Sequence, residues 1–243
     1  MTAFAIKIIA ISTMIIDHMG AVFDLDIGFR IVGRIAFPLF VYLIAEGCRH
    51  TKSMEKYMLR LGIFALVSEI PFDLAFNQMP NHPSPLIFDF LNNTNIFYTL
   101  FLGVACVYAA QKIIEAAKMF GWYTMALTMP VPIIAAMAAA DWLSTDYGYG
   151  GVLFIFCMAM AGKHKWLKLL SMAVFSFWLY FPWGLSMDGA AIPILLYMFG
   201  ASLLSVPIAA LANGRRGRPV KWLFYLIYPG HLLLFAAIAL IFT

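Results

Sequence analysis

Residues 4–23 read FAIKIIAISTMIIDHMGAVF, and this stretch decides the fold class. Its length matches the roughly 17 to 25 mostly apolar residues that an α-helix needs to cross a bilayer. The stretch carries Asp17 and His18 and lacks a cleavage site of small residues. We therefore interpret it as a retained first helix and not as a signal peptide.

Eight more apolar stretches follow, separated by turn residues. The chain of 243 residues is 63% hydrophobic and only 12% charged, about half the charged fraction of a soluble domain, and its mean hydropathy is +0.88. We predict an all-α, polytopic transmembrane bundle of about nine helices, forming one domain over residues 1–243. The sixth stretch is short enough to be tilted or re-entrant. The eight ranges are 30–48, 57–76, 95–114, 123–141, 148–162, 166–183, 189–211 and 222–242.

Basic residues are distributed unevenly over the connections between these stretches. Alternate connections hold thirteen of the sixteen lysines and arginines, whereas the others are acidic or neutral. Basic connections stay in the cytoplasm in multi-pass proteins. The four basic connections, which follow the second, fourth, sixth and eighth stretches, therefore all predict a cytoplasmic N-terminus and an odd number of helices. The thirteen are Arg49, Lys52, Lys56, Arg60, Lys112, Lys118, Lys163, Lys165, Lys168, Arg215, Arg216, Arg218 and Lys221.

Several ionisable residues lie inside the predicted helices. A charge at membrane depth is costly, and such residues usually face the bundle interior and serve a function. The alternative, that a given residue only pairs with another and locks two helices together, stays open for each of them. They are Lys7, Asp17, His18, Arg34, Glu46, Glu69, Asp73, Asp141 and His231.

His18 is the candidate general base, because imidazole exists in either protonation state near neutral pH. It shares a helix face with Lys7, about 16 Å away along the axis. Asp17 points about 100° away from His18, given 3.6 residues per turn, so it is badly placed to orient that ring, and it is a candidate partner of Arg34. His231 has no charged neighbour in sequence, and its structural and functional interpretations are balanced.

The sequence contains no motif of the common soluble enzyme classes. It has no glycine-rich phosphate loop, no HExxH and no paired CxxC. The cysteines Cys48, Cys106 and Cys157 lie in or beside apolar runs without metal-ligand spacing. We therefore expect no metal site. The topology accounts for the net charge of +4, so we expect membrane lipid and no nucleic acid as a partner.

Segments over nearly the whole chain resemble the TraX family of membrane proteins. The most specific are Asp17-His18 in the first helix and GRIAFPLF at 33–40 in the second. Weaker matches follow in order. They include Glu46-Gly47, SEIPFD at 68–73, Asp146-Tyr147-Gly148, Tyr228-Pro229 and His231-Leu232-Leu233.

The resemblance implies an activity. TraX is associated with N-terminal acetylation of pilin, and the family looks like part of a wider group of transmembrane acyltransferases that includes acyltransferase-3 proteins. The implied enzyme is an O- or N-acetyltransferase in the bacterial inner or plasma membrane. It would move an acetyl group from cytoplasmic acetyl-CoA, as donor substrate, to an amine or hydroxyl reached from the outer half of the membrane. The acceptor would be a pilin N-terminus, a peptide or a glycan.

The resemblance also implies roles for particular residues. In the wider group a first-helix histidine acts near mid-membrane, which makes His18 catalytic, and we expect Asp17, Arg34 and Glu69 beside it. Lys7 stands eleven positions before His18, where arginine is usual in acyltransferase-3 proteins. Lysine keeps the charge but lacks the fork that binds phosphate twice. Basic cytoplasmic residues can hold the CoA phosphates, and we expect this of Lys7, Arg215, Arg216 and Arg218.

Two other functions remain open. A secondary transporter also buries charges at depth and uses broken helices, which proline predicts at 36–38 and 129–132. The two halves of the chain show no repeat, which argues against a transporter. A non-catalytic membrane assembly factor is the other alternative, and it predicts that His18 is replaceable.

Overall fold

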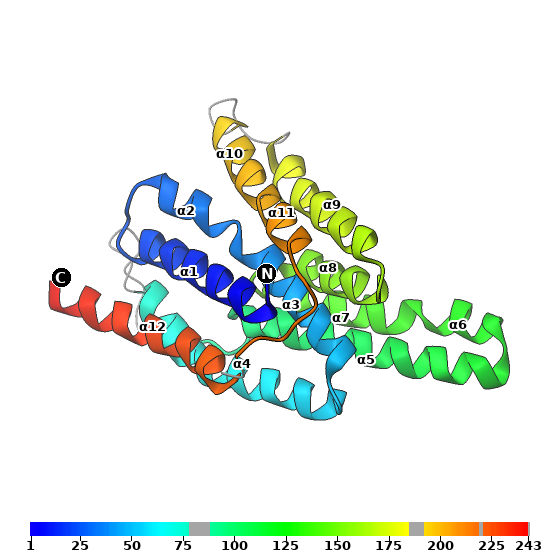
Figure 1. Ribbon diagram of the computed structural model, residues 1–243. Coiled ribbons are helices and arrows are strands. Elements are labelled where there is room, and N and C mark those ends of the chain that lie inside the picture. Colours follow the sequence, from blue (N-terminus) through cyan, green and yellow to red (C-terminus); the bar gives the residue numbers. More distant parts are fainter. Residues whose placement is uncertain (78–87, 185–191, 219–220, 243) are drawn as a thin grey trace. The chain divides into compact units, whose positions relative to one another are not determined.

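The computed structural model describes residues 1–77, 88–184, 192–218 and 221–242, and every regular element in them is a helix (Figure 1). This confirms the predicted all-α class. The helices are α1 Ala3–Val22, α2 Ile27–Gly33, α3 Ala36–His50, α4 Met54–Asn77, α5 Ile96–Phe120, α6 Trp122–Thr128, α7 Pro130–Trp142, α8 Gly148–Met160, α9 Lys165–Gly184, α10 Ile192–Leu203, α11 Ser205–Ala210 and α12 Lys221–Phe242.

Three pairs of consecutive helices each correspond to one predicted stretch: α2 with α3, α6 with α7, and α10 with α11. The second helix of each pair has a proline in its first turn, where the missing N–H is tolerated. With these pairs joined, the described residues contain nine helices, in the places that the sequence predicts. The prolines are Pro38, Pro130 and Pro207.

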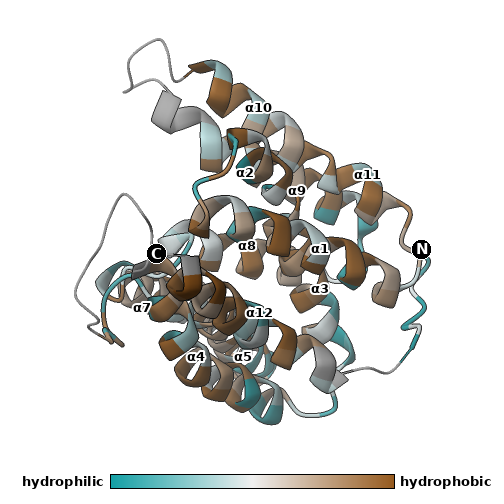
Figure 2. Cartoon of the chain, turned by 90° about the vertical axis from the view of Figure 1, so that its left-hand side faces the viewer, coloured by the Kyte–Doolittle hydropathy of each residue, from teal (hydrophilic) through white to brown (hydrophobic). Residues whose placement is uncertain are grey.

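Six of the nine are long and apolar enough to cross a membrane, namely Ala3–Val22, Ile27–His50, Ile96–Phe120, Trp122–Trp142, Ile192–Ala210 and Phe224–Ile241. The other three are α4, α8 and α9. Helix α8 has 13 residues, as its short apolar stretch predicts. Much of the visible length of α10 and α12 is brown in the hydropathy view, as lipid-facing helices require (Figure 2). The chain is therefore a multi-pass membrane protein.

The helices fall into two compact units that interleave in sequence. The first comprises Met1–Leu43, Ile70–Phe88 and His164–Thr243, and the second comprises Ile44–Glu69 and Asp89–Lys163. In the first unit, α1 packs on α2 and α12, and α10 packs on α9 and α2. In the second, α5 packs on α6, α7 and α8, and Figure 1 shows α5 alongside α6 and α7.

Two glycines bring α1 and α2 of the first unit together. A Cβ on Gly20 would lie 2.5 Å from Cβ of Phe29, and one on Gly33 would lie 2.1 Å from Oδ1 of Asp17. Asp26 begins α2 by accepting a hydrogen bond from the N–H of Gly28 at 2.7 Å. The sequence thus folds into a tight helical hairpin that holds Asp17 against α2.

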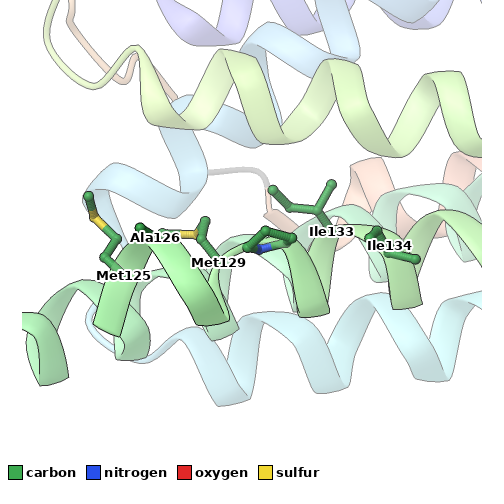
Figure 3. A pocket seen from close by; sticks show the side chains of 6 residues that line it. Met125, Ala126, Met129, Ile133 and Ile134 are labelled. Atoms are coloured by element: carbon green, nitrogen blue, oxygen red, sulfur yellow. The ribbon is translucent and has the colours of Figure 1, made fainter. Parts of the chain in front are cut away.

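The second unit has a shallow apolar groove at the break between α6 and α7. Figure 3 shows its lining, which contains no titratable side chain: Met125, Ala126, Met129, Pro130, Ile133 and Ile134. Only 11% of the most apolar part of this span is buried. A wholly apolar surface on a spanning helix suits lipid chains, and we assign it no chemistry.

Candidate active site

Two histidines meet in the first unit, one on α1 and the other on α12. Nδ1 of His18 and Nε2 of His231 are 2.8 Å apart, which is a hydrogen-bond distance. The planes of the two rings differ by 12°. The N–H and the lone pair of an imidazole both lie in the ring plane, so nearly parallel planes allow one ring to donate to the other.

The second nitrogen of His231 decides which ring donates. Nδ1 of His231 lies 2.8 Å from the main-chain oxygen of Ile227, and a carbonyl oxygen only accepts, so Nδ1 carries the proton. Nε2 of neutral His231 is then the acceptor, and Nδ1 of His18 is the donor. We therefore assign the proton of neutral His18 to Nδ1, which leaves Nε2 with a lone pair that can accept a proton.

Aromatic side chains surround the pair. His18 makes edge-to-face contacts with Phe76 and Tyr228, with ring centroids 5.6 and 5.9 Å apart. His231 makes the same kind of contact with Tyr228 and Phe235, and it is 8% exposed. Hydrogen bonds are electrostatically stronger in such low-dielectric surroundings, so the pair holds the His18 ring in a defined orientation.

Asp17, the residue before His18, is held by two arginines of the α1–α2 hairpin. Nη2 of Arg34 donates to Oδ1 of Asp17 at 2.5 Å, and Nη1 of Arg30 donates to Oδ2 at 2.8 Å. Nε of Arg34 donates to the main-chain oxygen of Arg30 at 2.9 Å. The structure thus contains the Asp17–Arg34 pair that the sequence suggested. Asp17 faces the arginines of α2, whereas His18 is hydrogen-bonded to His231.

This cluster adds positive charge beside the histidine pair. Arg30 and Arg34 both bond to the carboxylate of Asp17, the residue immediately before His18 on α1, so two guanidinium groups lie beside this part of the helix. Fixed positive groups in such a position can stabilise negative charge that develops on a nearby oxygen in a transition state. The site therefore combines a base with groups that can stabilise an oxyanion.

The four residues expected to hold the donor gather at the N-terminal end of α1. The N–H groups of Ala3 and Phe4 donate to the main-chain oxygens of Arg215 and Arg216 at 2.9 and 3.1 Å, and Gly217 lies close to Phe4. These contacts bring the loop with Arg215, Arg216 and Arg218 to the helix that carries Lys7.

Main-chain groups cannot bind an anion at this end of α1, because the loop and Thr2 already satisfy them. Besides the N–H groups of Ala3 and Phe4, that of Ala5 donates to the Thr2 hydroxyl at 3.3 Å. Side chains alone would hold the CoA phosphates. Lys7 lies over the Phe224 ring, with Nζ 5.0 Å from its centroid. This cation–π contact holds the ammonium group in position.

Glu69, the fourth residue expected in the catalytic group, lies in the second unit, where it accepts hydrogen bonds at the beginning of α5. Its Oε2 accepts from the side-chain amide of Asn95 at 2.5 Å and from the Asn95 main-chain N–H at 3.2 Å. Asn95 caps α5 by accepting from the N–H of Phe97. A carboxylate at a helix N-terminus is favourable, so these contacts stabilise the beginning of α5.

We expect Glu69→Ala to lower stability and leave the transfer rate of the folded protein unchanged. Glu69 and Asn95 are both 0% exposed, and an unsatisfied buried donor costs about 1–3 kcal/mol. Glu69→Gln keeps an acceptor oxygen and should therefore lose less stability than Glu69→Ala. Thermal unfolding in detergent measures this. A fully stable Glu69→Ala protein without activity would instead support the catalytic role implied by the sequence.

Sequence reasoning left two members of the site undecided or unassigned, His231 and Arg30. His231 has no charged neighbour in sequence, and only the packing of α12 on α1 reveals its partner. The role of Arg30 could have been predicted from its spacing, because it lies four positions, or one turn, before Arg34 on the same helix face. The pair of arginines could have been predicted to bind one carboxylate together.

Comparisons with known proteins place this geometry in context. The family model described as TraX protein matches residues 3–239. A relative from Dichelobacter nodosus, named "Probable fimbrial assembly protein FimC, serogroup H1", is 26% identical over 244 residues, covering 96% of this chain and 93% of the relative. No solved structure matches the chain significantly.

Proposed function

The chain belongs to the TraX family, and we propose that it is a membrane-bound acetyltransferase. It moves the acetyl group of cytoplasmic acetyl-CoA to an amine or hydroxyl acceptor that reaches the site from the outer half of the membrane. One observation carries the proposal: the hydrogen-bond chain from His18 through His231 to the Ile227 carbonyl. This chain leaves Nε2 of His18 as the basic nitrogen.

In this proposal His18 is a general base and then a general acid. The acceptor N–H or O–H gives its proton to Nε2 while its nitrogen or oxygen attacks the thioester carbonyl carbon. The tetrahedral intermediate then expels the CoA sulfur, and the imidazolium returns the proton to that sulfur. The products are the acetylated acceptor and the free CoA thiol. His231 accepts the hydrogen bond from Nδ1 throughout, which orients the ring and stabilises its positive form.

Arg30 and Arg34 supply the electrostatic part of this proposal. Negative charge develops on the carbonyl oxygen in the transition state, and fixed positive charges in a low-dielectric site stabilise it. Asp17 keeps both guanidinium groups beside α1. The residue next to His18 therefore sets the position of the groups that favour the oxyanion.

The donor would bind at the cytoplasmic end of α1. The phosphates of CoA would meet Lys7 and the loop with Arg215, Arg216 and Arg218, and the pantetheine arm would extend toward His18. His18 lies eleven positions after Lys7 on the same helix, about 16 Å along the axis, a span suited to an extended arm.

Neutralising the loop should weaken CoA binding. We expect the triple change of Arg215, Arg216 and Arg218 to glutamine to reduce CoA affinity by about tenfold at low salt, with a smaller difference at high salt. A matched control neutralises Lys52, Lys118 and Lys163, exposed residues on other predicted cytoplasmic connections. Binding by the purified protein, measured over a range of salt concentrations, checks this. Equal affinities in both triple variants would limit the loop to a role in topology.

The name of a relative supports one class of acceptor. Because a relative is named as a fimbrial assembly protein, we propose that the acceptor here is a fimbrial or pilin-type subunit, with its N-terminal amine as the acetylated group. We also propose that the N-terminus lies in the cytoplasm, since basic connections favour the cytoplasmic side, and that the membrane is a bacterial inner or plasma membrane.

The histidine pair provides the test of this function. His231→Phe removes the acceptor for the Nδ1 proton of His18 and should lower kcat by roughly a hundredfold, with little change in KM for the acceptor. His231→Gln offers a side-chain oxygen in its place and should restore part of the rate. Release of the CoA thiol by purified protein measures both variants against wild type.

Two outcomes would reject the proposal. One is a folded wild-type protein that releases no thiol from acetyl-CoA with any amine or sugar acceptor. The other is equal activity in wild type and His231→Phe, since the hydrogen-bond chain would then have no part in the reaction. Either result would favour the assembly factor, which needs no acyl donor.

A further inference from the structure

Arg30 has hydrogen-bond donors that the cluster does not use. Its Nη1 donates to Oδ2 of Asp17 at 2.8 Å and to the Asp17 main-chain oxygen at 3.2 Å. Among the residues that the structure describes, Nε and Nη2 of Arg30 make no hydrogen bond or ion pair. The Arg30 side chain is 32% exposed, so this unused edge of the guanidinium is accessible.

The position of this edge is fixed relative to His18. The second bond of Nη1 goes to the main-chain oxygen of Asp17, the residue immediately before His18, so the guanidinium lies against the turn of α1 that carries His18. An arginine that reached for lipid headgroups would extend away from the helix bundle. Here Asp17 draws the side chain inward instead, and Nη1 is held by two bonds that set its direction.

The hydrogen-bond geometry of the cluster leaves room for an anion at this edge. Asp17 divides its two carboxylate oxygens between Arg30 and Arg34, so it meets only Nη1 of Arg30 and does not form a two-pronged pair with either guanidinium. The remaining N–H donors of an arginine suit the oxygens of a carboxylate or phosphate, since both offer two acceptors side by side.

We propose that the unused edge of Arg30, formed by Nε and Nη2, binds an anionic group of the acceptor. Arg30 would thereby select acceptors that carry a carboxylate or phosphate near the amine or hydroxyl to be acetylated. This inference rests on the proposed function. It adds a substrate class: an acceptor whose anionic group bonds to Nε and Nη2 of Arg30 while its nucleophile reaches Nε2 of His18. Arg30 is then a specificity residue, and Asp17 positions it.

Two peptides test the proposal directly. They share a free N-terminal amine and a C-terminal amide and differ only at the second position, which is glutamate in one and glutamine in the other. We expect full-length wild-type protein in detergent to bind the glutamate peptide about tenfold more tightly, as for one charge-assisted pair. Arg30→Gln should abolish this preference, and Arg30→Lys should retain part of it.

Arg49→Gln is the matched control. The Arg49 side chain is 31% exposed and pairs with Glu46 at 2.7 Å, so the change removes an equal charge from a similar ion pair. It should leave the peptide preference intact. Equal binding of the two peptides by wild type overturns the proposal, and so does a preference that survives in Arg30→Gln. If Arg30→Gln does not fold, the wild-type preference and its reduction in Arg30→Lys decide the matter.

Two further measurements separate this inference from its alternatives. If phosphatidylglycerol in mixed micelles binds through Arg30 while the peptides bind equally, the site is for a lipid headgroup and the proposal is wrong. Acetylation of the same peptides then distinguishes the two claims. Equal acetylation of both peptides would keep the enzyme and overturn the acceptor selection. Arg30-dependent binding without acetyl transfer would keep the anion site and reject the enzyme.

Discussion

His18→Ala should reduce acetyl transfer by about a hundredfold to ten-thousandfold, the usual contribution of a general base. Nε2 of His18 is the nitrogen that the hydrogen-bond chain leaves unprotonated, and alanine offers nothing to accept the proton of the acceptor. CoA binding should persist, because the expected phosphate contacts lie at the other end of α1. Thiol release and CoA affinity, measured on one preparation, give both quantities.

A structural histidine would give a different result. Loss of His18 leaves Nε2 of His231 without its donor, and an unpaired buried group shows mainly as instability. Thermal unfolding of His18→Ala and His18→Gln therefore accompanies the rate measurement. The exposed His164 supplies the matched control, since His164→Ala removes an imidazole outside the site. A folded His18→Ala protein with wild-type turnover would show that His18 is not the base.

Gly33→Ala should cause the largest loss of stability, about 3–5 kcal/mol, the range expected when a buried ion pair is broken. The added Cβ would lie 2.1 Å from Oδ1 of Asp17 and 2.2 Å from its Cβ. Either the two helices separate or the carboxylate leaves Arg34. The Asp17 side chain is 13% exposed, so the arginines would lose a largely buried counter-charge. Unfolding in detergent measures the change.

Gly200→Ala is the control for this substitution. Gly200 lies within α10, and an added Cβ would have no neighbour within 4 Å. Alanine at such a helical position is neutral or stabilises the protein by up to about 1 kcal/mol. If Gly33→Ala unfolds like Gly200→Ala, the close contact between Asp17 and α2 does not hold the hairpin together.

The fold was predictable because membrane helices follow from the sequence pattern. Lipid requires each backbone group to be satisfied within a helix, so apolar runs alone placed the nine helices. Prolines predicted two of the three breaks, those before Pro38 and Pro130, whereas the break before Pro207 was not predicted and Pro71 and Pro229 lie within continuous helices. The pairing of Asp17 with Arg34 was also accessible, because opposite charges at a similar depth on neighbouring helices tend to meet.

The partner of His18 was not predictable in the same way. Counted from the helix starts, His18 lies about 22 Å along α1 and His231 about 15 Å along α12, so the sequence predicts different depths for the two rings. The rings nevertheless meet, because α1 and α12 pack with their starts offset. The contacts of Glu69 were hidden in the same way, because only the folded second unit shows Asn95 and the beginning of α5 beside it.

Acetyl transfer across a vesicle membrane, with donor and acceptor on opposite sides, tests the central claim most directly. Purified protein is reconstituted into vesicles, acetyl-CoA with a labelled acetyl group is supplied on the side of the basic loops, and an amine-bearing peptide is placed on the other side. The account predicts labelled peptide that accumulates with time in wild type and not in His18→Ala. Two results would contradict it. One is that folded, CoA-binding wild-type protein leaves the peptide unlabelled, and the other is that His18→Ala labels the peptide as fast as wild type does.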